Sequence, residues 1–157
     1  MIKQRLAWAI TGSGHYLRES LAVLTTLENV DIFLSKAAAE IIKQYGYQAQ
    51  LDATQHKVYQ DKTASSVPVE LFYEGRYHTL IIAPATSNTI VFACDTGVEL
   101  ESEAPRDNLV NVYPRKIDLD NVKKLSTFEY TQIVENIPSL QQALSMRLAS
   151  LPHQDVD

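Results

Sequence analysis

Residues 80–91 read LIIAPATSNTIV, an apolar run that stops at a proline and continues into small and polar side chains. Such a run is typical of an inner parallel strand, which we predict over 79–83. In open α/β sheets, ligands bind at the carboxyl ends of the strands. The turn at this end consists of Pro84, Ala85, Thr86, Ser87, Asn88 and Thr89. Its amides, hydroxyls and carboxamide suit a flat ring with many hydrogen-bond acceptors better than a metal or a peptide.

Length and composition indicate one globular domain over residues 1–157, with 45% hydrophobic and 21% charged residues. The formal net charge of −5 argues against a nucleic-acid partner. No apolar stretch approaches the roughly 20 residues needed to cross a bilayer, and the apolar run near the start is too short for a signal peptide. The single cysteine, Cys94, excludes a disulfide within the chain. We therefore expect a cytoplasmic protein without a membrane partner.

Apolar patterns predict strands that alternate with helices along the chain. Strands are predicted over 6–11, 30–34, 79–83 and 108–113, and a strand or extended segment over 67–72. Helices are predicted over 15–28, 36–45, 86–92, 119–125 and 127–148, the last with Pro138 as a break or a start. Loops are predicted over the polar stretch 47–66, with a possible helix fragment, and over the acidic stretch 94–107. This alternation predicts an α/β fold, a three-layer α/β/α sandwich with a mainly parallel, Rossmann-like (flavodoxin-like) sheet.

A second polar turn, Gly12-Ser13-Gly14, lies between the first strand and the first helix. The first amides of a helix and its dipole favour an anion at such a place, and the Ser13 hydroxyl adds a donor. Ser35 follows the neighbouring strand, so its hydroxyl is expected to reach the same region, and Lys36 adds positive charge. Ser35 is also a candidate cap for the helix over 36–45, which Gly46 is expected to end.

This turn differs from the known phosphate-binding motifs. The dinucleotide pattern G-x-G-x-x-G requires glycine at position 17, where the chain has Leu17, and Ser35 stands where an acid would hold a ribose hydroxyl. The chain also lacks the G-K-[ST] of a P-loop. One phosphate, and hence a mononucleotide, therefore fits better than a pyrophosphate. The alternative is that the two glycines only permit a tight turn and close helix–sheet packing.

Two segments carry a family resemblance, WAITGSGHYLRES (8–20) and GRYHTLIIAPATSNTI (75–90). They resemble the flavoprotein family that includes the phosphopantothenoylcysteine and lantibiotic-peptide cysteine decarboxylases. The similarity extends over about residues 5–92, and the branch that it resembles most is that of the archaeoflavoproteins and dihydromethanopterin reductases. The family's Pro-Ala-Ser-Ala-Asn-Thr motif reads here PATSNT (84–89).

The resemblance implies bound FMN and a homo-oligomer built from trimers, with the flavin near a subunit interface. On the phosphate side it places Gly12, Ser13 and Gly14, together with Ser35. Along the ribityl chain and the isoalloxazine it places Pro84, Ala85, Thr86, Ser87, Asn88 and Thr89. His15, which follows the glycine turn, is a separate candidate to contact the phosphate or the substrate or to position the flavin, and the alternative is an ordinary first-turn residue of the helix.

The chain departs from the decarboxylases at two places. Residues 68–71 contain no histidine where the decarboxylases carry their catalytic one, and the P-x-M-N-x-x-M-W segment is absent, since Trp8 is the only tryptophan. The leading hypothesis is therefore an FMN-dependent oxidoreductase that reduces dihydromethanopterin to tetrahydromethanopterin or a similar pterin or electron-transfer acceptor, using a donor such as NAD(P)H. The alternatives are a non-catalytic flavin-binding carrier and a flavin-dependent decarboxylase or transferase on the same scaffold.

Other chemistry-bearing residues have simpler interpretations. The histidines have no i, i+4 pair and there is no Cys/His cluster, so we expect no metal site. Cys94 is a redox thiol or, more simply, a small buried hydrophobe. The tyrosines of the middle of the chain are candidates for stacking on a pterin or, preferably, for an oligomer interface. They are Tyr45, Tyr47, Tyr59, Tyr73 and Tyr77. No catalytic residue is assigned.

Overall fold

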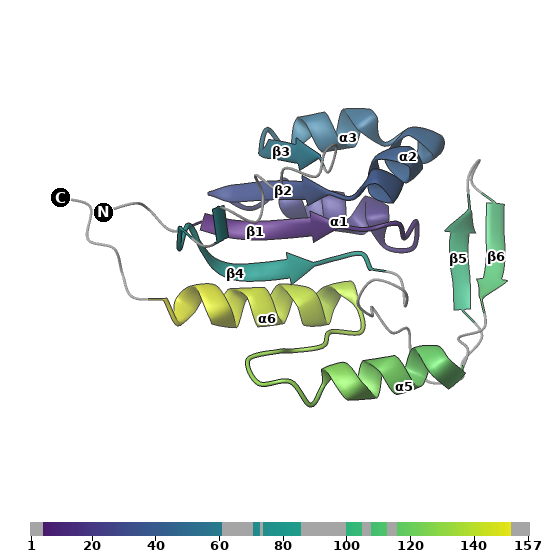
Figure 1. Cartoon of the computed structure of the whole chain (residues 1–157). Helices are drawn as coiled ribbons and strands as arrows, with labels where there is room; N and C mark the ends of the chain where they lie inside the picture. Colours follow the sequence, from purple (N-terminus) through teal and green to yellow (C-terminus); the bar gives the residue numbers. More distant parts are fainter. Residues whose placement is uncertain are drawn as a thin grey trace.

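The computed structural model describes residues 5–60, 71–72, 74–85, 100–104, 108–112 and 116–151. Its centre is a sheet of four parallel strands in the order β3-β2-β1-β4 (Figure 1). The strands are β1 (Arg5–Ile10), β2 (Val30–Leu34), β3 (Lys57–Gln60) and β4 (Tyr77–Ile82). Because all four run the same way, their carboxyl ends meet at one edge of the sheet. This confirms the predicted α/β class and parallel sheet.

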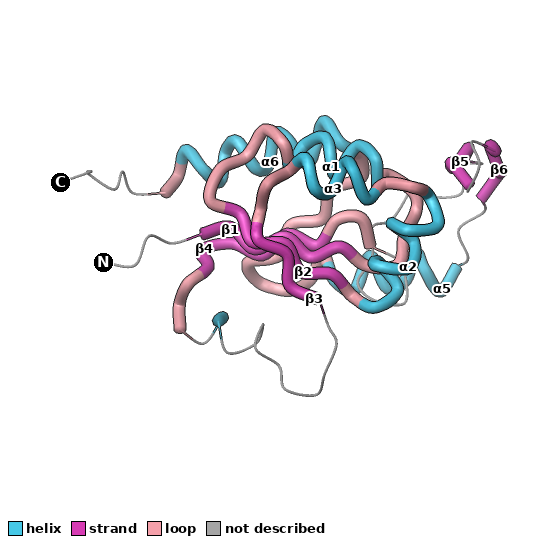
Figure 2. The backbone as a smooth tube through the Cα atoms, turned by 90° about the horizontal axis from the view of Figure 1, so that it is seen from above, coloured by secondary structure: helices cyan, strands magenta, loops and turns pink. Residues whose placement is uncertain are grey.

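The described residues contain five helices. They are α1 (Leu17–Leu24), α2 (Lys36–Tyr45), α3 (Gln48–Ala53), α5 (Lys116–Leu125) and α6 (Ile137–Ala149). Figure 2 shows α1, α3 and α6 over one face of the sheet, while α2 lies at the carboxyl ends of the strands. A separate antiparallel pair is formed by β5 (Leu100–Ala104) and β6 (Asn108–Val112).

The core lies between the sheet and α1, α3 and α6, and α2 adds Ala38 and Ile42 to it. Alternate residues of the strands point into it, among them Trp8 of β1 and Ile32 of β2, which are fully buried. The indole Nε1–H of Trp8 donates to the carbonyl of Ala83 at 2.6 Å, so this buried polar group is satisfied. Helix α6 adds Leu140 and Leu144 to the same cluster. Each fully buried aliphatic side chain contributes about 1.5–3 kcal/mol.

A buried charge lies on the other face of the sheet. Asp31 is only 2% exposed, and the Arg5 guanidinium donates to its Oδ1 through Nε at 2.9 Å, while the Tyr77 hydroxyl donates to Oδ2 at 2.8 Å. A buried carboxylate needs such partners, because its desolvation is costly. Burial, helped by this hydrogen bond, raises the pKa of Tyr77 well above its ordinary value of 10.0. On the same face, the rings of Phe33 and Tyr59 stack with their centroids 5.1 Å apart.

Helix α6 is also fastened to β4 by hydrogen bonds. The guanidinium of Arg147 donates to the Thr79 hydroxyl and to the His78 carbonyl, both at 3.0 Å. These residues are 68 and 69 positions apart in the sequence, so the contact joins the end of the last helix to the middle of the chain.

Three predicted segments differ in the structure. Strand β3 (Lys57–Gln60) lies inside the stretch predicted as a polar loop, and residues 71–72 are helical where an extended segment was predicted. Strand β5 (Leu100–Ala104) lies where an acidic loop was predicted, and it pairs with β6, which confirms the strand predicted over 108–113. Strand β3 is an edge strand with three exposed residues, so it has no alternating apolar pattern to detect.

Helix ends differ as well. Helix α1 ends at Leu24 rather than 28, because the hydroxyls of Thr25 and Thr26 bond back to the carbonyls of the preceding turn. Residues 127–136 are not helical, and Tyr130 takes a left-handed backbone with φ 60. Helix α6 begins at Ile137, with the Asn136 side chain accepting from the Ser139 amide at 2.8 Å and a proline in its first turn. The start predicted at Pro138 is thereby confirmed.

Some predictions fall outside the described residues. These are the helix over 86–92, Cys94, Tyr73, the extended segment at 67–70 and most of the loop over 94–107. Among the helices that the structure does describe, none combines the length and apolar character that a membrane span requires.

Candidate functional site

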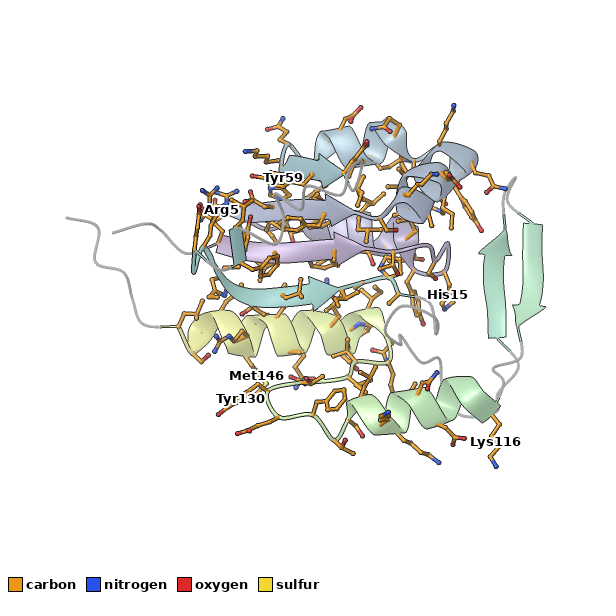
Figure 3. The ribbon with its side chains drawn as sticks, viewed as in Figure 1. Arg5, His15, Tyr59, Lys116, Tyr130 and Met146 are labelled. Atoms are coloured by element: carbon orange, nitrogen blue, oxygen red, sulfur yellow. The ribbon has the colours of Figure 1, made fainter. Side chains whose placement is uncertain are left out.

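The candidate site lies at the carboxyl edge of the parallel sheet, where three chain segments meet. These are the turn after β1, the junction of β2 with α2, and the residues that follow β4. Figure 3 shows His15 at this edge and Arg5 at the opposite end of the strands. The structure thus brings the glycine turn and the first two residues of the second predicted turn, Pro84 and Ala85, to one end of the sheet.

The turn after β1 is fastened to the end of β4 by Thr11. Its backbone N–H and its hydroxyl both donate to the carbonyl of Pro84, at 3.2 and 3.0 Å. Pro84 and Ala85 are themselves buried, and the Ala83–Pro84 peptide bond is cis. Residues 73 positions apart in sequence are therefore held together at the start of both predicted turns. Sequence reasoning missed Thr11, which reads there as the last residue of a strand.

Gly12 allows α2 to approach this turn closely. A Cβ placed on Gly12 would lie 2.9 Å from the Cβ of Ala37, in the first turn of α2. The Ser35 N–H donates to the Ile10 carbonyl at 3.2 Å, which joins the beginning of α2 to the end of β1. The first residues of α2 and the glycine turn are therefore neighbours, as predicted from the positions of Ser35 and Gly12.

Ser35 caps α2, as the sequence predicted. Its Oγ accepts a hydrogen bond from the Ala38 N–H at 3.0 Å, and Gly46 ends the helix with φ 73. A serine hydroxyl that accepts one bond still has its own O–H to donate. Lys36, the next residue, is exposed. Ser35 can therefore hold the helix and also face a ligand.

The rest of the glycine turn is compact. The Ser13 N–H donates to the Thr11 carbonyl at 2.9 Å, and the Ser13 hydroxyl to the His15 carbonyl at 3.4 Å. Gly14 packs against the ring of Tyr45, the last residue of α2, whose Cζ lies 2.6 Å from the place of a Cβ on Gly14. Both glycines thus serve close packing, the alternative that the sequence left open. The sequence named Tyr45 only as a candidate for stacking on a pterin or for an oligomer interface, and it gave no sign of the contact with Gly14.

The chemistry of this edge favours an anion. The amino ends of α1 and α2 both adjoin the turn, so their uncompensated N–H groups and dipoles favour negative charge there. The hydroxyl of Ser35 and the ammonium of Lys36 add donors. The Ser13 hydroxyl can add another if it exchanges its long 3.4 Å bond to the His15 carbonyl for a ligand. In the part of the chain that the structure describes, no three His, Cys, Asp or Glu side chains cluster as a metal site would require. The donor set fits a phosphate group.

The described part of the candidate site consists of Gly12, Ser13, Gly14, His15, Ser35, Lys36, Pro84 and Ala85. The remaining predicted site residues lie outside the described residues, namely Thr86, Ser87, Asn88 and Thr89. The ring of His15 lies 4.0 Å from that of Tyr16, centroid to centroid, beside the turn. Two of the tyrosines predicted at an oligomer interface, Tyr59 and Tyr77, pack within the chain against Phe33.

Comparison with known proteins gives consistent matches. The dihydromethanopterin reductase (acceptor) of Methanosarcina mazei is 36% identical over 100 residues, which are 55% of this chain and 42% of that protein. The protein of the same name from Methanocaldococcus jannaschii is 32% identical over 102 residues, 57% of this chain and 42% of that one. The chain thus spans less than half the length of these curated relatives.

Solved structures match over nearly the whole chain. Burkholderia xenovorans DmrB in complex with FMN, described as a cubic protein cage for redox transfer, is 40% identical with a TM-score of 0.81, and the match covers 94% of this chain and 96% of that one. Its apo form is 39% identical with a TM-score of 0.82, and the match covers 96% of this chain and 98% of that one. This likeness confirms the predicted flavodoxin-like α/β sandwich. The family model described as Flavoprotein matches residues 1–98, and the chain belongs to this family.

Proposed function

We infer that the protein is an FMN-dependent reductase. The observation that carries this inference is the turn after β1, which adjoins the amino ends of two helices and is bonded through Thr11 to the end of β4. A likeness of 40% identity to a protein solved with FMN, over 94% of this chain, supports the same cofactor.

The phosphate of FMN would lie at the glycine turn. Gly12, Ser13 and Gly14 would offer their backbone amides and the Ser13 hydroxyl, and Ser35 would donate from the neighbouring helix start. His15 and Lys36 would add positive or polar groups at the rim of the turn. A single phosphate matches the single glycine turn better than a pyrophosphate does.

The ribityl chain and the isoalloxazine would lie along residues 84–89. Pro84 and Ala85 are buried and fixed by the bonds from Thr11, so the segment starts from a rigid point. When bound, FMN supplies the electron-transfer chemistry, and the protein orients the ring and keeps water from it. Asn88, with one donor group and one acceptor group on its side chain, is the candidate for a polar contact with the ring.

The proposed acceptor is dihydromethanopterin, which would be reduced to tetrahydromethanopterin, or a similar pterin. Two relatives named for this reaction, at 36% and 32% identity, support it. A donor such as NAD(P)H would supply the electrons. The solved relative is described as a cubic cage, which supports a homo-oligomer for this chain, and we propose that it is built from trimers in the cytoplasm.

The first test is the cofactor itself. Purified protein should show a flavin absorption spectrum, and the released chromophore should have the mass of FMN. Replacing Ser13 with Asp should abolish FMN binding, because a carboxylate would face the phosphate. Gln142→Glu, which adds the same charge on the exposed surface of α6, should bind FMN like the wild type. A colourless protein that takes up no added FMN would refute the proposal.

The second test separates a reductase from a carrier. A reductase consumes its electron donor only when dihydromethanopterin or another acceptor is present, whereas a carrier binds FMN and shows no acceptor-dependent rate. Replacing Asn88 with Ala should lower both flavin occupancy and that rate. Full occupancy and full rate in this variant would remove Asn88 from the ring site.

A further inference from the structure

Tyr45 occupies the space next to Gly14 that any other residue at position 14 would fill. The Cζ and Cε2 atoms of its ring lie 2.6 and 3.1 Å from the place of a Cβ on Gly14, and its hydroxyl oxygen is closer still. Cβ atoms essentially never lie within 3.0 Å of another heavy atom, so a side chain at position 14 would require the tip of the Tyr45 ring to move. The ring tip therefore lies directly against the glycine turn.

The position of Tyr45 is set by the way α2 ends. Gly46 has φ 73 and its N–H donates to the Lys43 carbonyl at 3.2 Å, while the Tyr47 N–H donates to the Ile42 carbonyl at 2.9 Å. Ile42 is buried in the core with 1% exposure, which anchors this end of the helix. The rings of Tyr45 and Tyr47 lie 5.8 Å apart. The phenol of Tyr45 is thus carried by a well-fastened helix end.

Helix α2 contacts the glycine turn with both of its ends. At its start, Ala37 packs against Gly12, and at its end, Tyr45 packs against Gly14. Ser13 lies between these two contacts. Glycine has more backbone freedom than any other residue, so a turn with two glycines keeps one shape only when its neighbours hold it. Tyr45 supplies one of the two supports.

We propose that Tyr45 is a positioning residue for the phosphate side of the site, which holds Gly14 in the conformation that presents the turn to the phosphate of FMN. This proposal rests on the proposed function. Its consequence is specific to the phosphate, because riboflavin carries the same ring and ribityl chain but no phosphate. Loss of Tyr45 should therefore weaken the binding of FMN and leave that of riboflavin almost unchanged.

The experiment is a titration of the full-length protein, freed of flavin, with FMN and with riboflavin, followed by flavin fluorescence. Tyr45→Ala should weaken FMN binding roughly tenfold, since a loosened turn must be ordered again on binding, and change riboflavin binding by less than about twofold. Tyr45→Phe, which retains the ring, should restore FMN affinity to within about threefold of the wild type. Tyr130→Ala removes a tyrosine that is 98% exposed and should bind both flavins like the wild type.

A second variant covers the case in which Tyr45→Ala does not fold. Gly14→Ala introduces the excluded Cβ and pushes the tip of the ring away from the turn, so it should show the same selective loss of FMN affinity. Equal losses for FMN and riboflavin, or an unchanged preference for FMN, would overturn the role of Tyr45. A wild-type protein that binds neither flavin would instead refute the proposed function.

Discussion

Gly12→Ala is the substitution with the best-defined structural cost. The backbone of Gly12 lies outside the left-handed region, so alanine meets no left-handed strain there. The cost comes from one contact, because the new Cβ would lie 2.9 Å from the Cβ of Ala37. Ordinary contacts of a Cβ are 3.4–4 Å, so the two atoms must separate by at least about 0.5 Å.

The required movement falls on a helix rather than on a flexible side chain. The Cβ of Ala37 is fixed to the first turn of α2, which Ser35 caps and which is bonded to the end of β1. Overpacking of this kind costs about 1–3 kcal/mol. For a chain of this size, each kcal/mol lowers Tm by roughly 2–4 °C, so the variant should melt about 2–12 °C below the wild type.

The assay is urea unfolding followed by circular dichroism, with a double variant as the test of the contact. Ala37→Gly removes the second Cβ, so Gly12→Ala should cost at least about 1 kcal/mol less in the Ala37→Gly background than alone. Gly75→Ala is a useful comparison, because its φ of 68 carries strain while nothing lies within 4 Å of the new Cβ. Strict additivity of Gly12→Ala and Ala37→Gly would refute the reasoning.

Three further predictions concern other interactions. Ser35→Ala should lower the free energy of unfolding by about 1 kcal/mol, because the helix cap is lost, and equal stability of this variant and the wild type in urea would contradict this. Ser35→Asp should keep the cap but weaken FMN binding. Arg5→Met should destabilise the fold by about 3 kcal/mol, because Asp31 is left buried without its cation. The FMN affinity of the folded variant should not change, because the site lies at the opposite end of the strands. Burial, helped by the Arg147 guanidinium, lowers the pKa of His78 below 6.5. The unfolded chain therefore binds a proton at His78 at higher pH than the folded chain does, so the free energy of unfolding should fall as pH drops below 6.5. If the urea midpoint of His78→Gln falls with pH as steeply as that of the wild type, His78 is not the cause.

The inner elements of the fold were predictable because their patterns depend on burial alone. Strand β2 (Val30–Leu34) and helix α2 (Lys36–Tyr45) match their predicted ranges, and Ser35 and Gly46 bound the helix as expected. Strand β3 was missed because an edge strand with exposed residues lacks that pattern. Likewise, the left-handed Tyr130 and the polar residues around it interrupt what reads as one long helix over 127–148.

The candidate site was also only partly predictable from the sequence. Two polar turns at the ends of strands could be recognised from the sequence, because parallel strands bring such turns to one edge. The contacts that hold these turns in place could not be recognised from the sequence. Thr11 bonds to Pro84 across 73 residues, and Tyr45 reaches Gly14 only because α2 lies along the carboxyl edge instead of running back beside the sheet. Both contacts depend on how helices and strands pack, which no local pattern records.

The attachment of α6 to β4 has a consequence for how the protein is made. All four strands of the parallel sheet have been synthesised by residue 82, but Leu140, Leu144 and Arg147 arrive only with the last helix. A growing chain emerges amino end first, so for more than fifty residues of synthesis the apolar surface beside α1 and β4 has no cover. Nascent chains stalled before Ile137 should therefore engage holdase chaperones or aggregate, although they already contain every residue of the glycine turn and of the segment 84–89.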